Sequence, residues 1–97
     1  MICSEKSVER RLVRKVKAIG GRALKFTSPG FSGVPDRIVL LPGGRLYFVE
    51  LKRDDGNLTP IQHYVFNLFE KLGFPVRVLY GIEMVDDFIN EVSKVEV

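Results

Sequence analysis

Three residues in the middle of the chain have side chains suited to hydrolysing a phosphate ester. Asp36 begins one apolar run, and Glu50 and Lys52 end the next, two residues apart. Because side chains alternate along a strand, Glu50 and Lys52 would lie on one face. Carboxylates are preferred ligands of Mg²⁺, and a nearby ammonium can orient a water or neutralise a phosphate. A metal site is one interpretation, and a charged, solvated strand end is the other.

The two apolar runs are predicted to pair as a hairpin. A Pro-Gly-Gly turn at 42–44 separates residues 36–41 from residues 45–52, and such residues favour tight turns. A three-residue turn would place Asp36 opposite Glu50, with their Cβ atoms about 4.5–5.5 Å apart. Two carboxylates that close repel each other unless a cation lies between them. This register predicts a shared divalent ion, and a slip of one residue would separate the two acids.

The elements around the hairpin predict an α/β fold with a mixed central sheet. Apolar spacing and turn residues predict a helix over 5–19, strands over 23–27, 36–41 and 45–52, a helix over 60–72, a strand over 76–80 and a last helix around 85–92. The order is α-β-β-β-α-β with a C-terminal helix. Two strands joined through a helix imply a parallel crossover, which would put the hairpin inside the sheet.

Apolar side chains predict which parts of these elements are buried. The helix stripes are Val8, Leu12, Val16 and Ile19, then Ile61, Val65, Leu68 and Leu72, then Val85, Phe88, Ile89 and Val92. The aromatic residues expected in the core are Phe66, Phe69, Phe74, Tyr80 and Phe88. Phe31 lies in the glycine-rich loop 28–33, where we expect a buried anchor; stacking on an unpaired base is the alternative.

Length and composition predict a single globular domain over residues 1–97. The chain is 45% hydrophobic and has one cysteine, Cys3, which excludes an internal disulfide. No apolar run has the length of a membrane span, and residues 1–20 are too charged for a signal peptide. We therefore expect a cytoplasmic protein with no membrane partner.

Positive charge is concentrated near the N-terminus. The net charge is +3, but residues 1–25 hold eight Lys or Arg against two acids, and residues 81–97 hold five acids against one lysine. This favours a polyanion near the basic end, although a solvated helix face is the alternative. Candidates for contacts to a DNA backbone are Arg10, Arg11, Arg14, Lys25, Arg37 and Arg53.

The motifs around these acids resemble a known nuclease family. The stretch GGRALKFTSPGFSGVPDRIVLLPGGRLYFVELK, followed by Gln62, is similar to the VRR-NUC domain of the PD-(D/E)xK superfamily, in the compact stand-alone form of phages and bacteria. Gly-x-Pro-Asp-Arg, Glu-Leu-Lys and the downstream glutamine carry the resemblance, which covers about residues 5–80. It implies a restriction-endonuclease-like core.

The resemblance also implies roles for the central residues. Asp36 and Glu50 match the metal-binding carboxylates, with the backbone carbonyl of Leu51 as a further ligand. Lys52 matches the catalytic lysine, acting either as a base or as an electrostatic stabiliser. Gln62 matches a catalytic-site glutamine.

Two of the implied assignments have alternatives. A glutamate on the first helix completes the pattern; Glu9 is the match as a metal ligand, and Glu5 lies one turn earlier. Gln62 also stands three residues after Thr59, where a capping-box glutamine would lie.

The expected function is a Mg²⁺- or Mn²⁺-dependent DNA endonuclease. The resemblance implies cleavage that leaves a 5′-phosphate and a 3′-hydroxyl. Compact members of the family are similar to Holliday-junction resolvases, which implies branched DNA, a homodimer, and the cytoplasm of a bacterium or a phage-infected cell. The alternatives are a module that binds branched DNA without catalysis and a small adaptor protein that uses its C-terminal helix.

Overall fold

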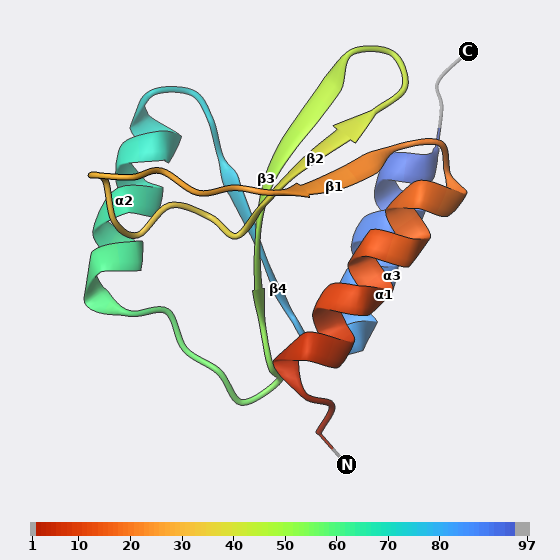
Figure 1. Cartoon of the computed structure of the whole chain (residues 1–97), viewed down its shortest axis with the longest axis horizontal. Helices are drawn as coiled ribbons and strands as arrows, with labels where there is room; N and C mark the ends of the chain where they lie inside the picture. Colours follow the sequence, from red (N-terminus) through yellow and green to blue (C-terminus); the bar gives the residue numbers. More distant parts are fainter. Residues whose placement is uncertain (1, 95–97) are drawn as a thin grey trace.

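The chain folds around one four-stranded sheet with helices on both faces (Figure 1). The computed structural model describes residues 2–94. The elements are α1 (Glu5–Ala18), β1 (Arg22–Lys25), β2 (Arg37–Leu41), β3 (Arg45–Lys52), α2 (Pro60–Lys71), β4 (Val76–Tyr80) and α3 (Gly81–Ser93). The strand order is β1-β2-β3-β4, and only β4 pairs in parallel. The predicted element order and the mixed sheet, with β2 and β3 at its centre, are confirmed.

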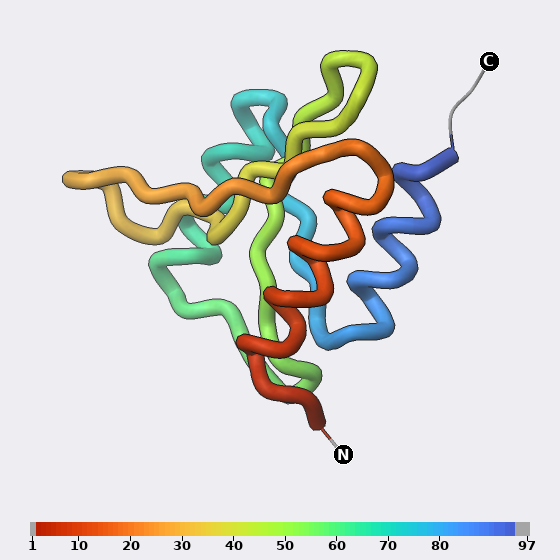
Figure 2. Tube along the Cα trace, turned by 45° about the vertical axis from the view of Figure 1, so that its right-hand side comes forward, coloured from red at the N-terminus to blue at the C-terminus, as the bar shows by residue number. Residues whose placement is uncertain are grey.

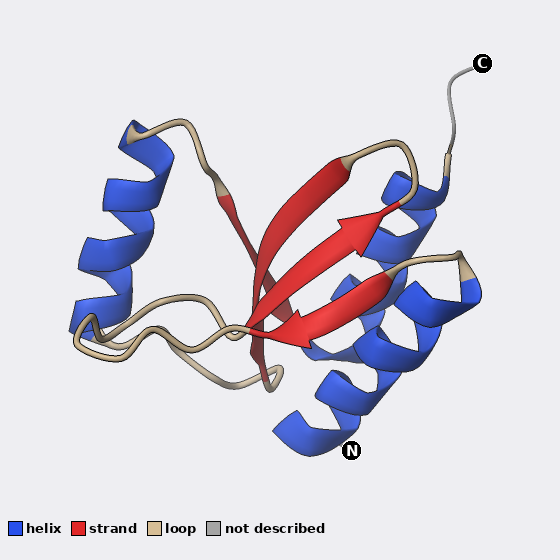
Figure 3. Ribbon diagram, turned by 45° about the horizontal axis from the view of Figure 1, so that its top comes forward, coloured by secondary structure: helices blue, strands red, loops and turns tan. Residues whose placement is uncertain are grey.

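The helices α1 and α3 lie side by side on one face of the sheet, and α2 lies on the other (Figure 3). The core between the helix pair and the sheet consists of aliphatic and aromatic side chains that are almost fully buried: Val8, Leu12, Val16, Val39, Leu41, Val49, Leu51, Leu79, Val85, Phe88, Ile89 and Val92. The stripe of α3 is therefore as predicted. That of α1 is buried as far as Val16, and the partly buried Ile19 caps the helix. Burial of these stripes is the main force that holds α1 and α3 to the sheet.

An ion pair fixes α1 against α3. The guanidinium of Arg11 donates two hydrogen bonds, each 2.8 Å long, to the two carboxylate oxygens of Asp86. The Lys15 ammonium lies 3.5 Å from the same carboxylate. Two parallel bonds constrain orientation as well as distance. Arg11 therefore serves the packing of the two helices.

The inner face of α2 differs from the predicted stripe. Val65 and Phe66 are buried, but Ile61 is 48% exposed and Leu72 is 65% exposed. The larger aromatic rings set the rotation of the helix, since Phe69 packs edge-on against Phe48 of β3 with a centroid distance of 5.2 Å. The prediction was wrong for Ile61 and Leu72, at the two ends of the stripe, because Phe66 and Phe69 take the inward-facing positions.

The helix α2 covers only part of its face of the sheet. Leu40 and Leu46, which pair near the hairpin turn, are 39% and 49% exposed. Phe74, expected in the core, is 56% exposed beyond the end of α2. Among residues 2–94, none of the helices combines the length and the apolar character that crossing a bilayer requires.

The long loop between β1 and β2 runs out beside α2 and returns to the sheet (Figure 2). Gly33 makes the close approach possible: its φ is +87°, and a Cβ there would lie 3.0 Å from Ile61 Cγ1 and 3.1 Å from Val65 Cγ2. Glycine tolerates both the conformation and the contact. Phe31, in the same loop, is 44% exposed, so the expectation of a buried anchor was wrong.

Candidate active site

The predicted hairpin register is confirmed, and it brings Asp36 to Glu50. β2 and β3 pair with Ile38 opposite Phe48. β2 starts one residue after Asp36, so both acids lie where the ladder ends. The N–H of Asp36 donates to Glu50 Oε1 at 3.1 Å, and the N–H of Leu51 donates to Asp36 Oδ2 at 3.2 Å. These two side chains replace the missing ladder bonds and link the strand ends.

The backbone of Asp36 is fixed although its side chain reaches solvent. Pro35 is fully buried, and as a proline it leaves no N–H to satisfy. On the other side, the Phe26 N–H donates to the Asp36 carbonyl at 2.8 Å. The exposed carboxylate of Asp36 is thus held at one place beside the sheet.

Glu50 is an acid with only 1% of its surface exposed. Burial, followed by the nearby charge of Asp36, raises the pKa of Glu50 to about 7, against the opposing effects of Lys52, the Asp36 N–H and Gln62. Its oxygens accept from Asp36 N and from Gln62 Nε2, the latter at 2.9 Å. Donors aimed at both oxygens suit a carboxylate, and a bound cation would favour the ionised form further.

Gln62 makes the contacts that both of its predicted roles require. Its side-chain oxygen accepts from the Thr59 N–H at 3.0 Å, and its backbone N–H donates to Thr59 Oγ1. The two bonds complete the capping box at the start of α2. Its amide nitrogen donates to Glu50. Because the two functions use opposite ends of one amide, neither excludes the other.

Lys52 lies next to the buried acid. Its ammonium is 3.5 Å from Glu50 Oε2, and its side chain is 14% exposed. The alternation of β3 puts both side chains on the same face, as predicted. The arrangement therefore places one positive charge beside two carboxylates at the open end of the β2–β3 pair.

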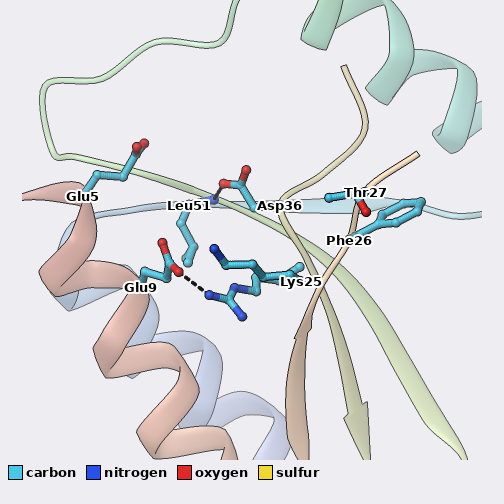
Figure 4. A pocket seen from close by; sticks show the side chains of 8 residues that line it. Glu5, Glu9, Lys25, Phe26, Thr27, Asp36 and Leu51 are labelled. Atoms are coloured by element: carbon cyan, nitrogen blue, oxygen red, sulfur yellow. Dashed lines mark hydrogen bonds and ion pairs between the residues drawn. The ribbon is translucent and has the colours of Figure 1, made fainter. Parts of the chain in front are cut away.

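A pocket of about 210 Å³ opens beside Asp36 on the α1 side (Figure 4). Its lining residues are Glu5, Glu9, Lys25, Phe26, Thr27, Asp36, Arg37 and Leu51. Glu5 and Glu9, one turn apart on α1, both face this pocket. The structure therefore brings both candidate glutamates to the side of Asp36.

Glu9 is held by a buried arginine. Arg37 is 8% exposed; its guanidinium pairs with the Glu9 carboxylate and donates to the Ala23 carbonyl at 3.1 Å. Among the residues that the structure describes, no three Asp, Glu, His or Cys side chains form a group that could hold a metal ion. The roles of Glu9 and Leu51 as metal ligands stay predictions.

The predicted DNA contacts divide into exposed and buried side chains. Arg10, Arg14 and Lys25 are exposed, and Arg53 is exposed beside Asp55. Arg37 is only 8% exposed, because it follows Asp36 and so points to the opposite face, toward α1; its contact with DNA stays a prediction. That alternation was the available signal for its pairing with Glu9. Arg11 is already paired with Asp86, and its contact with DNA likewise stays a prediction.

Comparison with known proteins agrees with the motifs. The structure matches a solved VRR_NUC domain with a TM-score of 0.83 and 34% sequence identity, covering 89% of this chain and 94% of that chain. A protein of Acyrthosiphon pisum secondary endosymbiont phage 1, named "Putative nuclease p44", is 48% identical over 75 residues, which are 77% of this chain and 81% of the phage protein. The chain belongs to the VRR-NUC family. No family model matches the sequence.

Membership in the VRR-NUC family confirms the restriction-endonuclease-like fold and supports a nuclease with DNA as its partner. In this VRR-NUC domain, the acids, the lysine and the glutamine singled out in the sequence come from three different segments. They are the loop before β2, the end of β3 and the first turn of α2. The fold brings all of them to one end of the central strand pair.

Proposed function

We propose that this VRR-NUC domain is a divalent-metal-dependent endonuclease that hydrolyses phosphodiester bonds in branched DNA. The observation that carries the proposal is the convergence of Asp36, Glu50, Lys52 and Gln62 at the open end of the β2–β3 pair. Each has a physical task there.

The donor set fits Mg²⁺ or Mn²⁺. The carboxylates of Asp36 and Glu50 would hold the ion, with the Leu51 carbonyl as a further candidate ligand, because hard divalent cations prefer oxygen. Burial and the charge of Asp36 raise the pKa of Glu50, and a bound cation would oppose both effects. When bound, the ion would supply positive charge that stabilises the scissile phosphate.

The side chains around the acids support hydrolysis in distinct ways. Lys52 can orient or deprotonate an attacking water or stabilise negative charge on the phosphate. Gln62 orients the Glu50 carboxylate from the end of a capped helix. In-line attack would leave a 5′-phosphate and a 3′-hydroxyl. Glu9 or Glu5 would complete the acidic side of the pocket.

The exposed basic residues bear on which DNA structure the protein prefers. The exposed arginines and lysines suit backbone contacts, and such contacts position DNA without reading its sequence. We therefore propose branched DNA such as a Holliday junction, bound by shape. A two-fold homodimer would present two active sites for paired cuts. We also propose that the protein acts in the cytoplasm of a bacterium or a phage-infected cell.

One gel tests the activity. Four-way junction, flap, duplex and single-stranded DNA are incubated with the wild type and Lys52→Ala, each in Mg²⁺, Mn²⁺ or EDTA. We expect the wild type to cut the junction in either metal and not in EDTA. We expect Lys52→Ala to lose at least about 100-fold in rate, since positioned proton transfer contributes about 10²–10⁴-fold.

Two other outcomes of that gel contradict the proposal. Equal binding of branched DNA in EDTA and by Lys52→Ala, with no cleavage anywhere, identifies a non-catalytic DNA-binding module. No salt-sensitive DNA binding at all favours an adaptor protein.

A further inference from the structure

The six basic residues of α1 divide between two sides of the helix. Arg11 and Lys15 face α3 and are neutralised by Asp86. Lys6, Arg10, Arg14 and Lys17 line a shallow groove of about 270 Å³ on the outer side, together with Glu9 and Val13. Within residues 2–94, none of these four outer cations makes an ion pair.

The outer groove begins at the candidate active site. Glu9 borders both this groove and the pocket that contains Asp36. A strand whose phosphate lies at Asp36 can therefore continue directly onto α1.

The spacing of the four cations suits a regular polyanion. They follow one another at intervals of three or four residues, and at 1.5 Å per residue Lys6 and Lys17 are about 16 Å apart along the helix. One DNA strand carries a phosphate every 3.4 Å of axis, so this length spans about five phosphates. Val13, which is 36% exposed, lies between the cations, where an apolar contact with a sugar is available.

An anionic membrane fits this face less well. The apolar stripe of α1 consists of Val8, Leu12 and Val16, all 0% exposed in the core. The helix therefore has no apolar side left to insert into a bilayer. An acidic protein surface is the remaining alternative, and the continuity with the pocket at Asp36 favours nucleic acid.

We propose that the outer face of α1 is a track for one DNA strand next to the cleavage site, formed by Lys6, Arg10, Arg14 and Lys17. The inference rests on the proposed endonuclease function and adds two residues, Lys6 and Lys17, that sequence reasoning missed. The strand runs along α1 past Glu9, from Lys6 to Lys17, so the enzyme holds about five phosphates on one side of the cut.

Salt titration of binding tests the track. Arg10→Gln, Arg14→Gln and the double variant are made in a Lys52→Ala background, and junction binding is measured in EDTA from low to moderate salt. Each lost contact reduces the slope of log K against log salt by about 0.9, so the double variant should lose about 1.8. Lys71→Gln, an exposed cation at the far end of α2, is the control and should keep the parent slope.

A backbone footprint supplies the second readout. The parent should protect about five phosphates on one side of the cleavage position, and the double variant should lose that protection while its circular dichroism and melting temperature stay unchanged. Parent-like slope and footprint in the double variant overturn the track. If wild type cuts DNA in the gel above, the proposed function survives that result. If the parent shows no salt-dependent DNA binding, both proposals fail, and retained binding of an acidic peptide would identify a protein partner instead.

Discussion

At the scale of single residues, Gln62 connects helix stability to the chemistry of the site. Its oxygen completes the capping box with Thr59, and its nitrogen holds the buried carboxylate of Glu50. Gln62→Glu removes the nitrogen that holds Glu50, and Thr59→Ala removes the hydroxyl that caps α2. The two tasks are therefore open to separate measurement.

Gln62→Glu should mainly reduce cleavage, whereas Thr59→Ala should mainly reduce stability. Gln62→Glu keeps an acceptor for the Thr59 N–H but removes the donor to Glu50 and adds a like charge, so we expect at least about a 100-fold loss of cleavage with α2 still capped. Thr59→Ala should cost about 1 kcal/mol in the free energy of unfolding and much less activity. Urea unfolding and single-turnover cleavage measure both. Equal losses of activity in the two variants would contradict the separation.

The raised pKa of Glu50 predicts how the metal-free protein responds to pH. The folded state keeps the proton up to a pKa of about 7, whereas the ordinary value is 4.5. The unfolded chain therefore binds fewer protons in this window, and the free energy of unfolding falls as pH rises through it. With 1.36 kcal/mol per unit, the decrease is about 3 kcal/mol by pH 8.

Urea unfolding in EDTA at pH 5 and pH 8 measures most of this decrease, because the unfolded carboxyl is already largely ionised at pH 5; Glu50→Gln is the control. The amide does not titrate, so the variant should show little of the change between the two pH values. A wild type that is equally stable at both, or a variant with the same pH dependence, rules out Glu50 as the source.

Residue types and spacing predict which residues of the candidate site lie together. The motif and the strand period put Asp36 opposite Glu50 and Lys52 on the face of Glu50, because a strand has only two faces and the turn length sets the register. The pairing of Arg37 with Glu9 was not predicted, since it depends on how α1 lies across the sheet. The residue type alone does not show whether an arginine is buried or exposed.

At the scale of elements, the loop before Asp36 depends on its contact with α2. The backbone at Gly33 passes so close to α2 that a Cβ there would lie only 3.0 Å from Ile61 and 3.1 Å from Val65. The same loop holds Asp36, and α2 holds Gln62. Their contact therefore sets the relative position of two site residues that are far apart in the chain.

Alanine at Gly33 and at Gly30 separates packing from backbone strain. Both glycines have positive φ, +87° and +81°, but a Cβ at Gly30 meets nothing within 4 Å. We expect Gly30→Ala to cost about 1 kcal/mol and Gly33→Ala at least about 1 kcal/mol more, with slower cleavage only in the latter. Unfolding and cleavage assays compare them. Equal costs would show that the contact with α2 contributes nothing.

The elements with a single apolar face or with short turns at their ends were predicted well. β3 and β4 have the expected bounds, and the stripe of α3 is buried as expected. The rotation of α2 was not predictable from periodicity, because Phe66 and Phe69 compete with Ile61 and Leu72 for the same sheet. The rotation of α2 depends on how its side chains fit against Phe48 and its neighbours, and the periodicity of the helix sequence holds no information about that fit.

At the scale of the whole molecule, an 11.0 kDa chain offers little surface for gripping a four-way junction. Two copies related by a two-fold axis would present two sites to two opposed strands. Paired incision is then a consequence of symmetry. A single copy would have to dissociate and bind again to cut the second strand.

Sedimentation equilibrium and a junction assay test the homodimer. We expect a mass twice that of the chain at working concentrations and cleavage of both opposed strands within one binding event. Mixing the wild type with excess Lys52→Ala should convert paired cuts into single nicks, because most wild-type copies would then have an inactive partner. A monomer that still makes paired cuts would contradict the dimer.

The capping box at Thr59 has a consequence for heat. Helix ends fray at free energies well below that of global unfolding. Whenever the first turn of α2 opens, the amide that restrains Glu50 leaves with it, although the sheet and the packing of α1 and α3 remain intact. Cleavage activity should therefore fall at a temperature some degrees below the unfolding transition seen by far-ultraviolet circular dichroism, and it should return on cooling.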